Sequence, residues 1–103
     1  MIIVLGSFVA QPSKIDDAIA LSLQHCARSR DEPGCISHDM HRDFHEPLRL
    51  RFVEKWADRA ALATHFAVPA TRDFARAIGA LASSSDGIEI LEATPISRKD
   101  ITG

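Results

Sequence analysis

The segment FVEKWADRAALATHF, residues 52–66, changes its hydrophobic period partway along its length. Its first part alternates every second residue, which is typical of a strand and places three side chains on one sheet face: Phe52, Glu54 and Trp56. Its second part has the i, i+3, i+4 spacing of one helix face, occupied by Leu62, His65 and Phe66. If the helix packs on the strand, a Trp, a Glu and a His meet among apolar side chains. The segment therefore predicts a pocket.

The remaining pattern predicts one α+β domain. Apolar, β-branched runs predict strands at 2–10, 35–42, 48–56 and 87–94, and helical spacing predicts helices at 13–30, 58–67 and 69–82. Ser13 and Asp16 resemble a capping box, Asp58 is a good N-cap, and Pro69 suits the first turn of a new helix. The order is that of a ferredoxin-like βαββαβ fold with a four-stranded antiparallel sheet. We expect a domain at 1–94 and a tail at 95–103.

Composition narrows the class of protein. The net charge of -2 comes from interspersed residues without a basic stripe, so no nucleic-acid partner is expected. No apolar run approaches the ~18 residues of a membrane span, and no basic segment precedes the short apolar start. These features favour a cytoplasmic protein that does not bind membranes. Cys26 and Cys35 are then expected to be free thiols.

One face of the expected sheet has no cover. The helices occupy one side, and on the other side Val53 lies with alternate residues of 2–9 and 88–91, which are mostly apolar. An exposed apolar sheet face favours association with a second copy of the chain. We expect a homodimer formed through the sheet faces.

Several short motifs resemble one known family. The IIV start, EPGC at 32–35, VEKW at 53–56 and the His65-Phe66 pair occur in the order and spacing of the antibiotic biosynthesis monooxygenase family. The resemblance covers about residues 1–94 and implies a dimeric α/β barrel. It implies a cofactor-independent monooxygenase that oxidises a small aromatic or quinol substrate with molecular oxygen. A non-catalytic module that binds a small hydrophobic ligand, and an isomerase of a small metabolite, are alternatives on the same fold.

The candidate catalytic residues are His65 and Trp56. Histidine has an ordinary pKa of about 6.5, so His65 can take a proton from a phenol, and the indole of Trp56 can form a flat wall. Glu54 also has a structural interpretation, in which backbone groups or an Arg pair with its carboxylate. Structural roles for His65 and Trp56 stay open as well. The expected substrate-binding residues are His38, Met40, Phe52, Glu54, Leu62, Phe66 and Phe74.

The sequence predicts neither a metal site nor a cofactor. His38 and His41 lie on opposite faces of the expected strand, so they cannot bind one ion together with His45 without a bulge. Phosphate loops, dinucleotide-binding glycines and nucleophile elbows are absent. The chain also contains no asparagine, the residue that haem-degrading relatives use on their first strand. Haem degradation is therefore not expected.

Overall fold

The computed structural model describes all 103 residues and contains a four-stranded antiparallel sheet. Its strands lie in the order β2-β3-β1-β4, and their bounds are Ile2–Ala10 (β1), Cys35–Arg42 (β2), Arg49–Trp56 (β3) and Ala82–Glu92 (β4). The central strands β1 and β3 are the most apolar, which suits positions with neighbours on both edges. This topology confirms the α+β ferredoxin-like fold.

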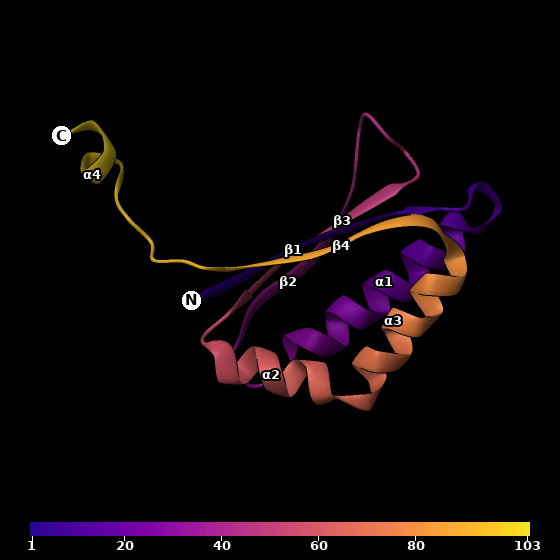
Figure 1. Cartoon of the computed structure of the whole chain (residues 1–103), viewed down its shortest axis with the longest axis horizontal. Coiled ribbons are helices and arrows are strands. Elements are labelled where there is room, and N and C mark those ends of the chain that lie inside the picture. Colours follow the sequence, from indigo (N-terminus) through magenta and orange to yellow (C-terminus); the bar gives the residue numbers. More distant parts are fainter.

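Three helices cover one face of the sheet (Figure 1). They are α1 (Ile15–Arg30), α2 (Arg59–Ala67) and α3 (Pro69–Leu81), and a 3-10 turn at Pro12–Lys14 precedes α1. The Asp58 side chain accepts a hydrogen bond from the Ala61 N–H, as expected of an N-cap, and Pro69 begins α3. The expected cap at Ser13 is wrong, because the 3-10 turn moves the N-cap to Lys14, whose side chain makes no capping bond.

Two features of the strands differ from the sequence expectation. β4 begins at Ala82, immediately after α3, although Ser83–Gly87 looks like a loop. Residues 82–85 pair with the C-terminal end of β1, with two register shifts. This pairing is possible because β1 extends to Ala10. In β2, simple alternation along 35–42 would place Ile36 on the same face as His38, but a register shift between Cys35 and Ser37 turns Ile36 outward to 57% exposure.

The helix-covered face contains the core. Along β3, the residues Leu50, Phe52, Glu54 and Trp56 are all buried, which confirms the alternation expected for this strand. The strand register places His38 directly opposite Glu54, and Cys35 opposite Trp56. Polar side chains therefore lie side by side under the helices, in a layer that is otherwise apolar.

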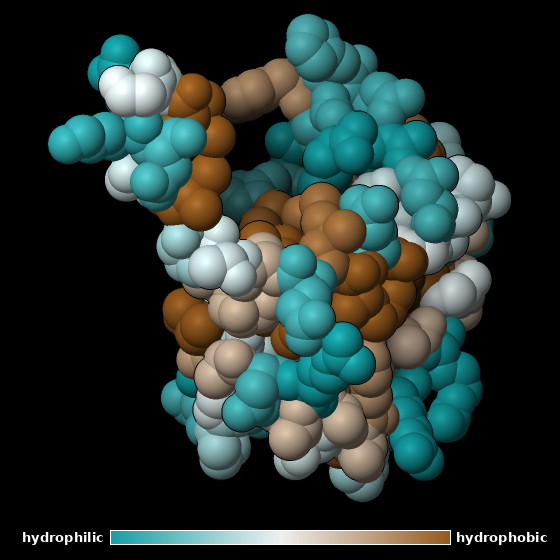
Figure 2. Space-filling model, turned by 60° about the vertical axis from the view of Figure 1, so that its left-hand side comes forward, coloured by the Kyte–Doolittle hydropathy of each residue, from teal (hydrophilic) through white to brown (hydrophobic).

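The opposite face of the sheet carries no helix. Leu5 lies beside Val53 and Ile3 beside Leu91, and Leu5 and Leu91 are 37% and 40% exposed. Apolar side chains interrupt the hydrophilic surface in Figure 2, where the short helix α4 (Arg98–Thr102) stands apart from the body. No helix combines the length and the apolar character that crossing a membrane requires.

Candidate functional site

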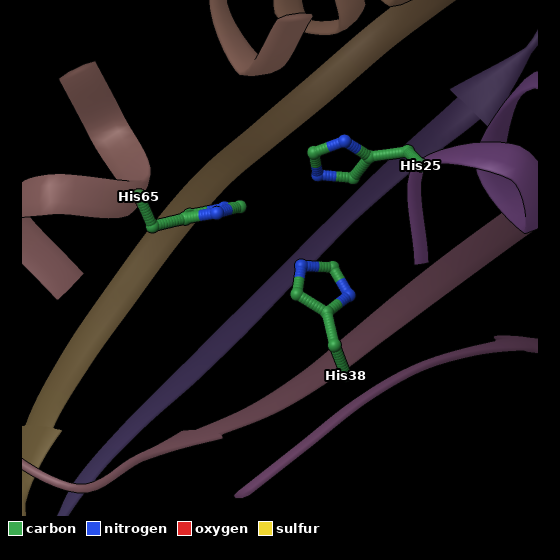
Figure 3. A group of neighbouring side chains, drawn as sticks. All are labelled: His25, His38 and His65. Carbon is green, nitrogen blue, oxygen red and sulfur yellow. The ribbon is translucent and has the colours of Figure 1, made fainter. Parts of the chain in front are cut away.

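Three histidine rings meet beneath the helices. His25 from α1, His38 from β2 and His65 from α2 point toward a common space (Figure 3). They are 4%, 0% and 2% exposed, and one ring nitrogen from each lies within 4.8 Å of the others. Imidazole nitrogens can hold a transition-metal ion or pass protons, so the cluster has two possible chemical uses.

Glu54 lies against this cluster. Its Oε1 is 3.2 Å from Nε2 of His38 and 4.0 Å from Nε2 of His65, and it accepts a 3.0 Å hydrogen bond from the Trp56 indole N–H. Neither an Arg nor a backbone group holds the carboxylate, in contrast to the sequence expectation. Burial raises the pKa of the Glu54 carboxyl, but His38 and Trp56 outweigh burial, and the net pKa is below the ordinary value.

The outer nitrogen of each ring has its own partner. Nδ1 of His65 is 2.9 Å from Oε1 of Glu32, and Nδ1 of His38 is 3.3 Å from Sγ of Cys26. Nδ1 of His25 is 2.6 Å from the Arg28 guanidinium, which can only donate. The Nε2 atoms are therefore left to face the centre of the cluster.

A tight turn brings Glu32 to His65. Gly34 follows Glu32 and Pro33 with φ +82°, in the left-handed region that glycine tolerates, and its carbonyl accepts a 2.8 Å bond from the Ala57 N–H. A Cβ at position 34 would lie 2.5 Å from the Cβ of Ala61. The glycine thus allows the turn to pack against the start of α2, the helix that carries His65.

His25 is held neutral in the folded protein. Burial, together with the nearby His38, Arg28 and His65, lowers the pKa of His25 to about 3. Phe74 stacks on its ring at a centroid distance of 3.9 Å. Because Arg28 donates to Nδ1, the neutral ring carries its proton on Nε2. His25 is therefore a donor toward the cluster and a poor base.

Two pockets lie beside the cluster on the helix side of β4. A pocket of about 210 Å³ reaches Glu54 and His25 and has Phe52, Phe74 and Ile88 among its walls. A groove of about 360 Å³ lies near the end of β4, lined by Ile2, Arg59, Leu62, Ala63, Phe66, Ile90 and Glu92. Of these two, only the smaller pocket touches the polar cluster. A further pocket of about 260 Å³ between α1 and α3 reaches His25 and Arg28 and is also lined by Phe74.

The expected site residues divide between these features. Phe52, Glu54 and Phe74 line the small pocket, and Leu62 and Phe66 line the groove, with Phe66 39% exposed. Neither pocket includes Met40, which packs against the core, and neither includes the buried residues of the polar layer: His38, Trp56 and His65. Among the expected site residues, Glu54 lines the small pocket and also lies 4.0 Å from Nε2 of His65.

Sequence reasoning missed two residues. His25 continues the spacing of Ala18, Ser22 and Ser29 on the buried face of α1, and this helical periodicity could have identified it. Glu32 lies in a turn, where no periodicity indicates which way a side chain points. Only the packing of the turn on α2 brings its carboxylate to His65.

The sequence of this chain is similar to one described protein family and to a curated protein. The sequence profile described as antibiotic biosynthesis monooxygenase matches residues 1–77. An uncharacterised protein of Synechocystis is 41% identical over 73 residues, which are 71% of this chain and 50% of that protein, so the chain spans about half the length of this curated relative.

Solved structures share the fold. A crystal structure named antibiotic biosynthesis monooxygenase has a TM-score of 0.83 at 30% identity and covers 92% of this chain and 100% of its own. The structure of a Deinococcus radiodurans protein described as a candidate antibiotic biosynthesis monooxygenase has a TM-score of 0.89 at 23% identity and covers 95% of this chain and 97% of its own. This second similarity supports the fold alone. Taken with the profile match, these similarities establish that the chain belongs to the antibiotic biosynthesis monooxygenase family.

Proposed function

We propose that the protein is a cofactor-independent monooxygenase of a small aromatic or quinol substrate. The observation that carries the proposal is the carboxylate of Glu54 at the wall of an apolar pocket, with two buried imidazoles directly behind it. The family and the name of one structural relative point to oxygenation. A phenol that loses its proton becomes a much better electron donor to oxygen, so an acceptor for that proton is the main requirement.

The cluster offers a route for the proton. A phenol in the pocket can donate to Glu54, whose Oε1 lies 4.0 Å from Nε2 of His65, a gap that a small side-chain rotation closes. His65 passes charge outward through its Nδ1 to Glu32, whose side chain is 14% exposed. The proton thereby leaves an apolar site by way of the chain's own side chains.

The reaction balances without a further reductant. A hydroquinone and one molecule of oxygen give a hydroxyquinone and one water, so one oxygen atom enters the ring and the other leaves as water. The substrate itself supplies the electrons. The pocket of about 210 Å³ suits a compact ring system, because it lies below the ~300–1,000 Å³ common for drug-sized ligands. The rings of Phe52 and Phe74 are the aromatic walls.

Oxygen uptake tests the proposal. Metal-stripped protein without a tag, mixed with benzo- and naphthohydroquinones in an oxygen electrode, is expected to consume one oxygen per hydroxyquinone formed and to release no peroxide. Glu54→Gln is the matched control, since the amide preserves the shape and still accepts from Trp56. Its rate should fall to that of autoxidation. Tight binding of these ligands with no oxygen uptake would instead favour a ligand-binding module.

A homodimer through the sheet faces forms part of the proposal. The contacts that support it are Leu5 beside Val53 and Ile3 beside Leu91 on the face without helices. A pair of copies would bury this apolar surface, which a single copy leaves in water.

We expect Val53→Asp to weaken this dimer at least tenfold, because the variant buries an unpaired carboxylate at the centre of the interface. Ala20→Asp on the exposed surface of α1 adds the same charge away from the interface and should leave the dimer intact. Sedimentation velocity across a concentration series measures both. A wild-type chain that stays at 11.3 kDa up to high micromolar concentrations would contradict the dimer.

A further inference from the structure

We propose that His25, His38 and His65 together form a binding site for one divalent transition-metal ion of the zinc type. Imidazole nitrogen is a preferred ligand of Zn²⁺ and Co²⁺, and three histidines with one further ligand complete a tetrahedral site. The sequence argument against a metal site considered His38, His41 and His45, which lie along one segment. The structure assembles a different set from three separate elements (Figure 3).

The spacing of the rings is close to what an ion requires. The three nitrogens lie within 4.8 Å of one another, whereas Zn–N bonds of ~2.0–2.1 Å in a tetrahedron place nitrogens about 3.3 Å apart. Each nitrogen must therefore move inward by about 1 Å, which rotation of the side chains supplies. The three rings are buried, so a bound ion would be enclosed.

The surroundings support ligation by Nε2. Glu32 at Nδ1 of His65 is the kind of carboxylate partner that orients metal-binding histidines, and Cys26 contacts Nδ1 of His38. Nε2 of His38, on a ring that is 0% exposed, lies 3.2 Å from Oε1 of Glu54 in an ion-pair contact that lacks the alignment of a good hydrogen bond. Buried polar atoms usually have a well-formed hydrogen bond, and an ion at the centre of the cluster would give this nitrogen a direct bond.

The local charge favours a cation. Two carboxylates, Glu54 and Glu32, and one guanidinium, Arg28, contact the three rings, which leaves a net charge of -1 beside the site. Oε1 of Glu54 is close enough to His38 and His65 to become the fourth ligand. A dication therefore enters a site that already has an excess of negative charge.

Arg28 opposes binding at one ring. Since the guanidinium can only donate, the 2.6 Å contact leaves Nδ1 of His25 without a proton and places the proton on Nε2, the atom that must coordinate. The ion can bind only after this proton moves to Nδ1 and Arg28 turns away. Removing the guanidinium should therefore strengthen metal binding.

Metal binding would also occupy the lone pair of His65 Nε2. The same atom cannot hold an ion and accept a proton, so a bound ion would block the proton route described above. Metal binding is measured without any activity assay. Its outcome therefore does not depend on whether the protein is a monooxygenase.

Cobalt titration tests the site. Metal-stripped protein without a tag is expected to bind one Co²⁺ per chain, with the visible absorption bands of a four-coordinate ion, and Zn²⁺ should displace it. Zn²⁺ should also raise the melting temperature, and a chelator should reverse the rise. His25→Phe, His38→Gln and His65→Gln should each weaken binding at least tenfold, whereas Arg28→Gln should strengthen it.

Exposed histidines are the matched controls. His41→Gln and His45→Gln change residues at the surface and should leave the affinity unchanged. His25→Phe is the decisive variant if others fail to fold, because a phenyl ring can keep the stack on Phe74. Absence of binding, binding that survives His25→Phe, or binding lost in the two control variants would overturn the proposal.

Discussion

His65→Ala is expected to lower turnover of a hydroquinone by about 10²-fold or more, which is the usual loss when an acid–base group is removed. The alanine breaks the route between Glu54 and Glu32, so the phenol proton stays in the apolar pocket. The helix should still form, because Leu62 anchors α2 in the core and Asp58 caps its start. Turnover and melting temperature are measured on the same sample.

Two further variants separate catalysis from packing. Leu62→Ala removes a core side chain from the same helix and should cost about 2–5 kcal/mol of unfolding free energy without a comparable loss of specific activity. Glu32→Gln keeps the shape of the contact with His65 but removes the carboxylate at the outer end of the proton route, and should also slow turnover. If His65→Ala melts much lower yet keeps its specific activity, His65 has a structural role only.

Hydrophobic periodicity and the residues at helix boundaries are sufficient to predict most of this fold. Alternation along β3 identifies Phe52, Glu54 and Trp56 as one buried face. Asp58 and Pro69 correctly mark the starts of the two helices that follow β3, α2 and α3. The start of β4 could not be found in this way, because serines and aspartate have weak strand preferences. Its pairing depends on the length of β1, which is a tertiary property.

The contacts within the candidate site are harder to predict from periodicity in the sequence. The alternation of side chains along β3 predicts that Glu54 lies beneath the helices. The partners of Glu54 depend on the register of β2, which sets His38 opposite Glu54. Likewise, helical spacing placed His65 inward, but not behind Glu54. A titratable side chain in a turn, such as Glu32, has no periodic signal at all, and the resemblance of the EPGC motif identified the family without indicating a role for its glutamate.

The metal-free protein is expected to lose stability between pH 8 and pH 5 because of His25. The unfolded chain takes up a proton at this residue below about pH 6.5, whereas burial and the neighbouring Arg28, His38 and His65 keep the folded ring neutral down to its pKa of about 3. The unfolded state thus binds more protons across this window, and stability falls as the pH falls. With allowance for solvent screening at the pocket wall, the loss at pH 5 is about 1–2 kcal/mol.

His25→Phe isolates this contribution. The phenyl ring fills the same space against Phe74 but cannot take a proton in either state, so the variant should show a shallower decline in unfolding free energy from urea titrations at pH 8, 6.5 and 5. The window stays above the ordinary pKa of 4.5 for Glu54, whose lowered pKa adds acid sensitivity only at lower pH. The other histidines are present in both proteins, so the difference between the two profiles reports mainly on position 25. Parallel pH profiles for the two proteins would mean that the folded state accepts a proton at His25 as readily as the unfolded chain, which would contradict both its burial and the donor role assigned to its Nε2.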